Sequence, residues 1–347
     1  MGVDGADDVT APTGTPPMAS DLVGIHQIRA AARVLDGVTL QTPLVRFGRP
    51  TEDRYLKVES LQPIGAFKLR GAYVAVASLT EAERRRGVVS YSSGNHAQGV
   101  ARAARLLGAP AVIVMPNDAP RIKSARVEED GAEIVWVGPS SDERRRVAEE
   151  LATERGLAII PPFDDDRIIA GQGTVGLEIA EELPDLAAVL VPIGGGGLAS
   201  GVAVAVKAVR PGARVIGVEP ELAADARDSL EQGRIVAWPA ESVGRTIADG
   251  TRTTSLGERT FAHMSRLLDG IVTVGEDEIA AAVRLIAEET RLVAEPSGAL
   301  AAAAMRFRWR ELGLGDAPGS VVGVLSGGNV DPERYIEYLR AQVADLA

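Results

Sequence analysis

The chain has 347 residues, 46% of them hydrophobic and 24% charged, which is typical of a soluble globular protein with room for two domains. The formal net charge of −11 argues against a nucleic-acid-binding protein, and the absence of cysteine excludes disulfides and thiolate chemistry and fits the cytoplasm. No apolar run reaches the roughly 18 residues of a membrane span, and residues 1–20, rich in Gly, Pro, Thr and Asp, predict a disordered tail.

The hydrophobic pattern then predicts a helix over 22–36, an extended turn at 42–44 and a strand over 55–59. Further strands are expected at 88–92, 111–115, 133–137, 157–160, 187–192, 214–219, 271–274 and 320–325. Helices are expected at 95–107, 121–129, 142–155, 173–183, 198–209, 276–291, 297–312 and 332–346, whereas 220–270 is less regular. This alternation predicts an α/β fold with buried parallel sheets, in which ligands bind beyond the carboxyl ends of strands.

Lys68 lies three residues after Gly65 and near the N-terminus of an expected helix, because Ala72, Val76 and Leu79 have helical spacing. An ammonium group at that place opposes the positive end of the helix dipole, which favours the neutral amine. A lysine that loses its proton easily can form a Schiff base with an aldehyde cofactor. A solvated lysine without chemistry is the alternative interpretation.

Three loops rich in Gly, Ser and Asn follow expected strands. The loop of Ser92, Ser93, Gly94, Asn95 and His96 predicts an anion site for a carboxylate, or an ordinary helix N-cap. Gly194, Gly195, Gly196, Gly197 and Leu198 predict a phosphate site, or a plain turn. Ser326, directly after the strand 320–325, is placed to contact a ring nitrogen, or it only begins a turn.

The second loop also supports a different class of enzyme. Gly194, Gly196 and Ala199 match G-x-G-x-x-A, and Glu219 ends the next expected strand, as a dinucleotide site requires. A nicotinamide-dependent oxidoreductase is therefore an alternative. It leaves Lys68 and the other two loops without a role.

Eight motifs in order carry a resemblance that extends from about residue 20 to the end of the chain. They are FKLRGA (67–72), SSGNHAQGVA (92–101), AGQGT (170–174), GGGGL (194–198), EPELAADA (219–226), TIADG (246–250), EPSGA (295–299) and SGGNVD (326–331). The sequence resembles pyridoxal-phosphate enzymes of fold type II, in the serine/threonine dehydratase and serine racemase group. This resemblance implies a two-domain, tryptophan synthase β-like fold, with a small domain over 61–160 and a large domain over 21–60 and 161–347.

The resemblance also implies roles for individual residues. Lys68 looks like the Schiff-base lysine and the base for the α-proton, and Ser93 like the acid/base on the opposite face. Cofactor contacts are implied for Phe67, Asn95, Gly194 to Gly197, Leu198 and Ser326, and substrate-carboxylate contacts for the loop from Ser92 to His96. Glu219, the carbonyl of Ala223 and Asp225 match a divalent-cation site, which would suit Mg²⁺ or Ca²⁺.

The expected activity is elimination of water from a β-hydroxy amino acid such as L-threonine or L-serine, giving a 2-oxo acid and ammonia. Serine racemase and threo-3-hydroxyaspartate dehydratase activities are the alternatives within the group, and a non-catalytic cofactor-binding relative is a third interpretation. The expected partner is a small amino acid, with neither nucleic acid nor membrane. The resemblance implies a homodimer or a larger homo-oligomer.

Overall fold

The structure is a computed structural model that describes residues 22–49, 51–92, 94–117, 119, 121–138, 141–315 and 319–342. The tail expected at 1–20 and the candidate residue Ser93 lie outside the described residues. Within the described ranges, no helix combines the length and the apolar character needed to cross a membrane.

The larger sheet has the strand order β1-β2-β10-β7-β8-β9. Its strands are β1 (Leu44–Arg46), β2 (Arg54–Val58), β7 (Leu186–Pro192), β8 (Arg214–Pro220), β9 (Gly270–Val274) and β10 (Ser320–Leu325). All neighbours pair in parallel except β1 and β2, which are antiparallel. The predicted parallel sheets are thus confirmed. Strand β1, where the sequence predicts only an extended turn, is antiparallel to β2 because the short connection between them has no room for the crossover that a parallel pair needs.

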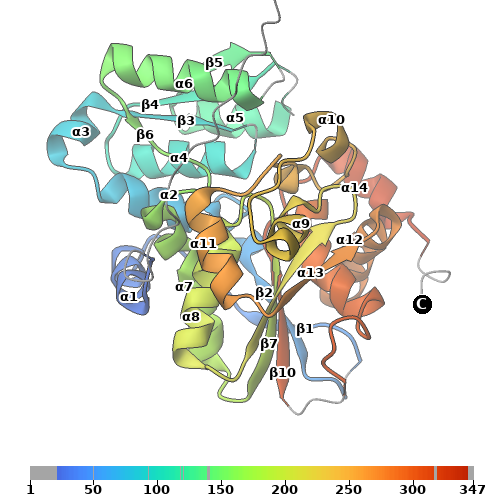
Figure 1. Cartoon of the computed structure of the whole chain (residues 1–347). Coiled ribbons are helices and arrows are strands. Elements are labelled where there is room, and N and C mark those ends of the chain that lie inside the picture. Colours follow the sequence, from blue (N-terminus) through green and yellow to red (C-terminus); the bar gives the residue numbers. More distant parts are fainter. Residues whose placement is uncertain are drawn as a thin grey trace, which may run out of the picture.

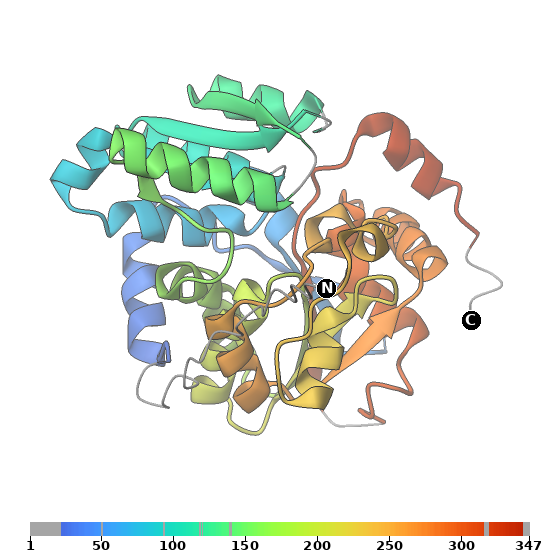
Figure 2. The ribbon, with the colours of Figure 1, turned by 45° about the horizontal axis from the view of Figure 1, so that its top comes forward.

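The smaller sheet is wholly parallel, with the order β5-β4-β3-β6, and lies above the larger one in Figures 1 and 2. Its strands are β3 (Val88–Tyr91), β4 (Ala111–Pro116), β5 (Glu133–Val137) and β6 (Ala158–Ile159). The helices around it are α3 (Glu81–Arg86), α4 (Asn95–Leu106), α5 (Arg121–Glu129) and α6 (Ser141–Arg155). Apart from β1 and β2, successive strands thus have helices between them, as the sequence pattern predicts.

Helices cover both faces of the larger sheet and bury two apolar clusters against it. On one side the cores include α7 (Asp166–Glu182), α8 (Gly197–Val209) and α11 (Glu258–Leu267), and on the other α12 (Glu276–Thr290) and α13 (Pro296–Phe307). The remaining elements are α1 (Ile25–Val34), α2 (Lys68–Ala77), α9 (Asp225–Gln232), α10 (Ala240–Val243) and α14 (Pro332–Leu339), with the 3₁₀ turns η2 (Glu59–Leu61) and η3 (Asp249–Thr251). Helix α2 lies between the two sheets, against both α4 and α7.

The domain limits at about 60 and 160 stay a prediction, although all four strands of the smaller sheet lie between them.

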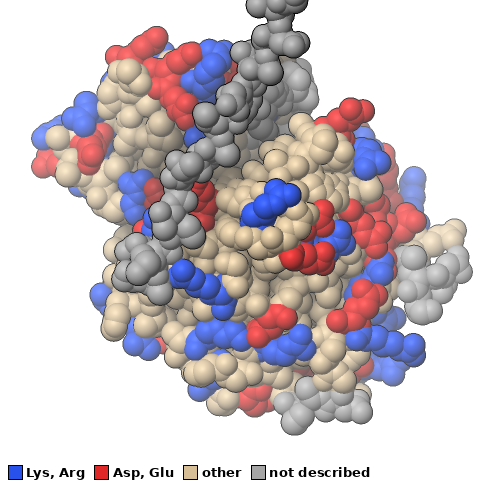
Figure 3. Space-filling view, viewed as in Figure 1, with Lys and Arg blue, Asp and Glu red and all other residues tan. Residues whose placement is uncertain are grey.

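Acidic and basic side chains are interspersed over the face drawn in Figure 3.

Candidate active site

A cavity of about 350 Å³ opens where several strands end and several helices begin. Its lining includes segments that follow β3, β7 and β10, and the first residues of α2, α4 and α8. Every expected cofactor contact lines it: Phe67, Lys68, Asn95, Gly194, Gly195, Gly196, Gly197, Leu198 and Ser326. Ser92, Gly94 and His96 line it as well, so the structure brings together Lys68 and the described parts of all three loops.

Lys68 is the first residue of α2 and lines the cavity. Its Nζ donates a hydrogen bond to the carbonyl oxygen of Pro162 at 2.9 Å and lies 5.1 Å from the centre of the Phe67 ring. Burial lowers the pKa of the Lys68 amine to about 8. A substantial fraction of the amine is therefore neutral near physiological pH, as a nucleophile or a base requires.

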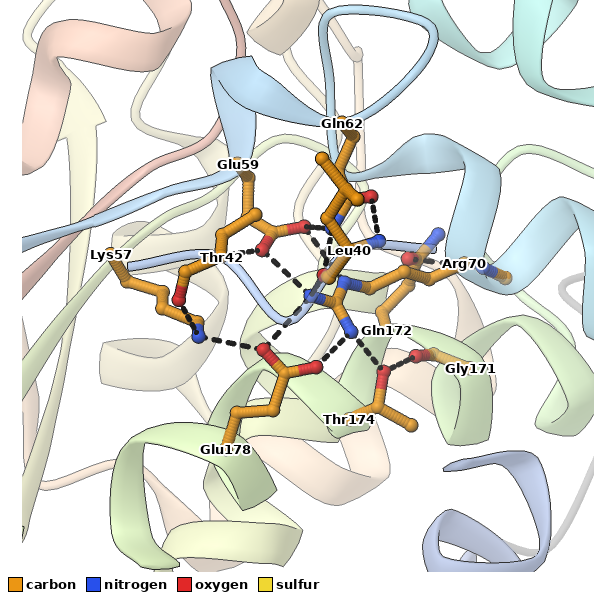
Figure 4. A network of polar contacts seen from close by, with 11 residues as sticks. Leu40, Thr42, Lys57, Glu59, Gln62, Arg70, Gly171, Gln172, Thr174 and Glu178 are labelled. Carbon is orange, nitrogen blue, oxygen red and sulfur yellow. Dashed lines mark hydrogen bonds and ion pairs between the residues drawn. The ribbon is translucent and has the colours of Figure 1, made fainter. Parts of the chain in front are cut away.

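Arg70, two residues after Lys68, belongs to a buried network of charges (Figure 4). Its guanidinium donates to the carboxylates of Glu59 at 2.8 Å and of Glu178 at 2.5 Å, and Lys57 pairs with Glu178 at 2.6 Å. These side chains come from β2, η2, α2 and α7. The network therefore fixes the first turn of α2, and with it Lys68, to η2 and α7.

Asn95 and His96 begin α4 and are held by hydrogen bonds on different elements. Asn95 donates through Nδ2 to Glu295 at 2.5 Å and accepts from Asn329 at 2.8 Å, so the orientation of its amide is fixed. His96 donates through Nε2 to the carbonyl of Ile160 at 3.1 Å. Burial, and then the nearby Lys68 charge, lower the pKa of His96 to about 3, so its imidazole is neutral at physiological pH.

The glycine loop (residues 194–197) connects the end of β7 to α8. Gly196 has a φ of 90°, which disfavours residues with a side chain. A Cβ atom at Gly195 would lie 2.2 Å from the ring of Phe163, and one at Gly197 would lie 3.2 Å from its backbone. Side chains would therefore fill the space beside this loop, and the first turn of α8 leaves backbone N–H groups for an anion.

The third loop places Ser326 beside the start of α13. Its Oγ is 3.4 Å from the carbonyl oxygen of Ser297. The hydroxyl of Ser297 in turn accepts a hydrogen bond from the N–H of Gly250 at 2.8 Å. Ser297 and Gly250 also line the cavity, together with Glu295, Phe163 and residues 249–255. The sequence interpretation gave these residues no role, although the motifs TIADG and EPSGA contain several of them.

The three residues of the expected cation site do not line the cavity. The carboxylate of Glu219 accepts from the N–H groups of Ala226 at 3.0 Å and Arg227 at 2.8 Å. Because Glu219 is bound to the start of α9 and does not line the cavity, it is not placed to hold a ribose there as the dinucleotide interpretation requires. Burial raises the pKa of Asp225 to about 7, and burial with the neighbouring Asp225 charge also raises the pKa of Glu219.

Comparison with known proteins identifies the family. Residues 35–327 match the family described as pyridoxal-phosphate dependent enzymes. The chain is 44% identical to the L-threo-3-hydroxyaspartate ammonia-lyase of Saccharomyces cerevisiae, over 81% of this chain and 84% of the relative. It is 43% identical to the L-threonine ammonia-lyase of Thermotoga maritima, over 89% of this chain and 76% of the relative.

A solved structure agrees with these sequence matches. Maize serine racemase superposes with a TM-score of 0.86 at 36% identity, covering 91% of this chain and 96% of that one. The order of motifs, the buried lysine and the glycine loop thus occur on a fold shared with such enzymes. The chain belongs to the family of pyridoxal-phosphate-dependent enzymes.

Proposed function

We propose that this protein is an ammonia-lyase that converts a β-hydroxy amino acid, such as L-threonine or L-serine, to a 2-oxo acid and ammonia. The observation that carries the proposal is the meeting of Lys68, the glycine loop and the start of α4 in one cavity. Relatives named as L-threonine and L-threo-3-hydroxyaspartate ammonia-lyases, at 43% and 44% identity, support it.

The residues of the cavity fit pyridoxal phosphate. Lys68 would hold its aldehyde carbon covalently, and the glycine loop, with the N–H of Leu198, would hold its phosphate beside Phe163, where Cβ atoms would clash. Asn95 would contact the ring hydroxyl, Phe67 would pack against the ring, and Ser326 would contact the ring nitrogen. When bound, the cofactor supplies an electron-withdrawing system that stabilises negative charge on the substrate's α-carbon.

The protein's own groups would carry out binding and proton transfer. The substrate carboxylate would bind the N–H groups at the start of α4, in the loop from Ser92 to His96, where the helix dipole favours an anion. Lys68, with a pKa of about 8, would remove the α-proton as a neutral amine. Loss of the β-hydroxyl as water leaves an enamine, which takes up one water and releases a 2-oxo acid and ammonia.

Ser326 would favour this outcome over other reactions of amino acids. Its hydroxyl can donate a hydrogen bond to the ring nitrogen but cannot keep a proton there as an aspartate would. A weaker electron sink disfavours a long-lived carbanion and favours rapid expulsion of a β-leaving group.

The test is the visible absorption spectrum of the purified protein before and after L-threonine, with the 2-oxo acid measured in parallel. We expect a band of bound cofactor that shifts with substrate, and no 2-oxo acid from Lys68→Ala. A band of bound cofactor without production of the 2-oxo acid would show that the protein is a non-catalytic relative. A protein that stays colourless after added pyridoxal phosphate would contradict the proposal.

A second candidate substrate is threo-3-hydroxyaspartate, which carries an additional carboxylate. Arg144 and Arg145 of α6 and Arg252 after η3 all line the cavity, so several cations surround the substrate space. Arg144→Ala should then reduce kcat/KM for L-threo-3-hydroxyaspartate more than for L-threonine. An equal loss for both would show that Arg144 does not select the second carboxylate.

Racemisation is an alternative activity of the same site. It requires an acid opposite Lys68, and Ser93, which lies outside the described residues, is the sequence-based candidate. Chiral analysis of L-serine after incubation tests this, since D-serine should form with wild type and not with Ser93→Ala. Absence of D-serine from both would reject racemisation.

We also propose that the protein is a cytoplasmic homodimer or larger homo-oligomer. Its lack of cysteine fits a reducing compartment, and its family resemblance supports assembly. Light scattering on the purified protein and cell fractionation test the two statements. A monomer, or a protein outside the cytoplasm, would contradict them.

A further inference from the structure

Three helices present their first turns to the cavity. They pack against one another, directly or through α7, at positions occupied by glycine. Lys68 begins α2, Asn95 begins α4, and Gly197 begins α8. Helix α7 lies between α2 and α8 without contributing to the cavity lining. The motif AGQGT (170–174) is part of α7, and the proposed function gives it no task.

The contact between α4 and α2 lies directly behind the reactive lysine. A Cβ atom at Gly99 of α4 would lie 3.1 Å from the carbonyl oxygen of Lys68 and 3.3 Å from the Cβ of Ala72. Both distances are shorter than ordinary van der Waals contact between such atoms. Gly99 therefore allows α4 to approach the backbone of the first turn of α2 as closely as it does.

The contact between α2 and α7 is also made by backbone atoms. A Cβ atom at Gly171 would lie 2.6 Å from the Cα of Gly71 and 2.8 Å from the carbonyl oxygen of Arg70. Any side chain at Gly171 would therefore push α2 away from α7, because backbone atoms cannot turn aside as a flexible side chain can.

The contact between α7 and α8 continues the series. A Cβ atom at Gly201 of α8 would lie 2.3 Å from the carbonyl oxygen of Ile169 and 2.5 Å from the backbone nitrogen of Gly173. Further along the same helices, a Cβ atom at Gly176 would lie 2.8 Å from the Cα of Val202. Gly201 is only one turn after Gly197, so a displacement here moves the glycine loop itself.

We propose that Gly71, Gly171, Gly173 and Gly201 are positioning residues that set the separation between Lys68 and the glycine loop. This inference rests on the proposed function, because Lys68 and that loop are there assigned to the two ends of one cofactor. The helices touch through their backbones, so van der Waals contact between backbone atoms sets their spacing, and side-chain rotamers cannot adjust it. The cofactor is rigid, and both of its ends bind strongly only when this spacing matches its length.

The experiment compares two aldehydes on the apoprotein: pyridoxal phosphate, which binds at both ends, and pyridoxal, which lacks the phosphate. Dissociation constants are measured by visible absorption for wild type and Gly201→Ala. We expect Gly201→Ala to weaken pyridoxal phosphate binding by about 10- to 100-fold. Pyridoxal binding should change less than threefold, because pyridoxal needs only Lys68 and the ring contacts.

Two control variants separate positioning from a loss of stability. Gly212→Ala lies in open space and should leave both constants unchanged. Ile286→Ala, in the buried core of α12, should lower the unfolding temperature without changing the ratio of the two constants. If Gly201→Ala does not fold, Gly173→Ala is measured in the same way and should also reduce the preference for pyridoxal phosphate. Its contacts are milder, because a Cβ atom there would lie 2.6 Å from the flexible end of Ile28 and 2.9 Å from the carbonyl oxygen of Gly201.

The outcomes distinguish this inference from the proposed function. A wild-type protein that binds no pyridoxal phosphate would contradict both. A wild-type protein that prefers pyridoxal phosphate, with the same preference in Gly201→Ala and Gly173→Ala, would contradict only the positioning role. Equal weakening of both aldehydes would likewise show that these glycines act on folding or on Lys68 alone.

Discussion

At the residue scale, burial and not a charged partner lowers the pKa of Lys68. The pKa of its amine falls from 10.5 to about 8, and desolvation is the cause. Its hydrogen bond to the carbonyl of Pro162 uses one N–H and leaves the amine able to approach an aldehyde. The sequence argument, which relied on the helix dipole, identified the residue but not the main cause of its reactivity.

This pKa predicts how cofactor attachment to the apoprotein depends on pH. With a pKa of about 8, roughly a tenth of the amine is neutral at pH 7 and about nine-tenths at pH 9. The rate of cofactor attachment is followed by visible absorption and divided by the rate for free Nα-acetyl-lysine in the same buffers. This ratio should show a midpoint near pH 8. If the rate instead parallels that of the free amine up to pH 10, the lysine is not buried as described.

In the proposed cation site, Asp225 and Glu219 would supply two buried carboxylates, and the Oδ2 of Asp225 has no hydrogen-bond partner among the described residues. No group of three or more His, Cys, Asp or Glu side chains able to hold a metal occurs among the described residues. A cation would therefore need the Ala223 carbonyl and water as further ligands.

The corresponding prediction is that Ca²⁺ or Mg²⁺ raises the unfolding temperature of wild type but not of Asp225→Asn. Without metal at pH 8, Asp225→Asn should be more stable than wild type, because it removes a carboxylate whose burial disfavours its charged form. Asp277→Asn, an exposed substitution in α12, should still respond to the cations. An unchanged wild-type melting curve in both salts would reject the site.

At the element scale, the network around Arg70 connects β2, α2 and α7 through four buried or mostly buried charges. Its two cations and two anions balance, so the group is neutral as a whole. Desolvation makes such a network a poor source of net stability, but removal of one member leaves another charge uncompensated.

Arg70→Met should therefore lower the free energy of unfolding by about 3–5 kcal/mol, since Glu59 would stay buried without its main partner. Arg85→Met, which removes an exposed pair with Glu81 on α3, is the control and should cost less than about 1 kcal/mol. Urea denaturation of both variants gives the comparison. Similar losses for the two would show that the buried network does not anchor α2.

Most helices and strands could be predicted from periodicity, and α5 has the expected limits. Helix α7 begins at Asp166, well before the expected 173, because Asp165 caps it and glycines hide its helical pattern. Those glycines stand where other helices touch α7, which a single sequence cannot reveal. Helices α9, α10 and α11 lie in the segment expected to be irregular, and the short helix α3 was not expected.

At the scale of the whole molecule, contacts between the two sheet layers converge on the cavity. Arg126 of α5 donates to the side chain of Asn329, which follows β10 and in turn donates to Asn95. The layers are therefore connected through polar side chains beside the expected substrate site, and not only through α2. The locations of these side chains follow from strand order, which the sequence pattern left open.

We predict that a carboxylate ligand draws the smaller sheet's layer toward the larger one, because the start of α4 would bind that carboxylate. A suitable probe on the cofactor-loaded protein is 3-hydroxybutyrate, which has the carboxylate and β-hydroxyl but no amine. It should decrease the radius of gyration in small-angle scattering and slow trypsin cleavage. Butane-1,3-diol, which lacks the carboxylate, should do neither; equal effects of the two would contradict closure.

The position of β10 has a consequence for how the protein is made. This strand comes after all the others in the sequence, yet it pairs with β2 on one side and β7 on the other. While a ribosome is still producing the chain, the strands from β3 to β6 are already available to form their own sheet, but β2 and β7 have no strand between them. Two unpaired strand edges are then exposed, and we expect newly made chains to be prone to aggregate until residues 320–325 emerge.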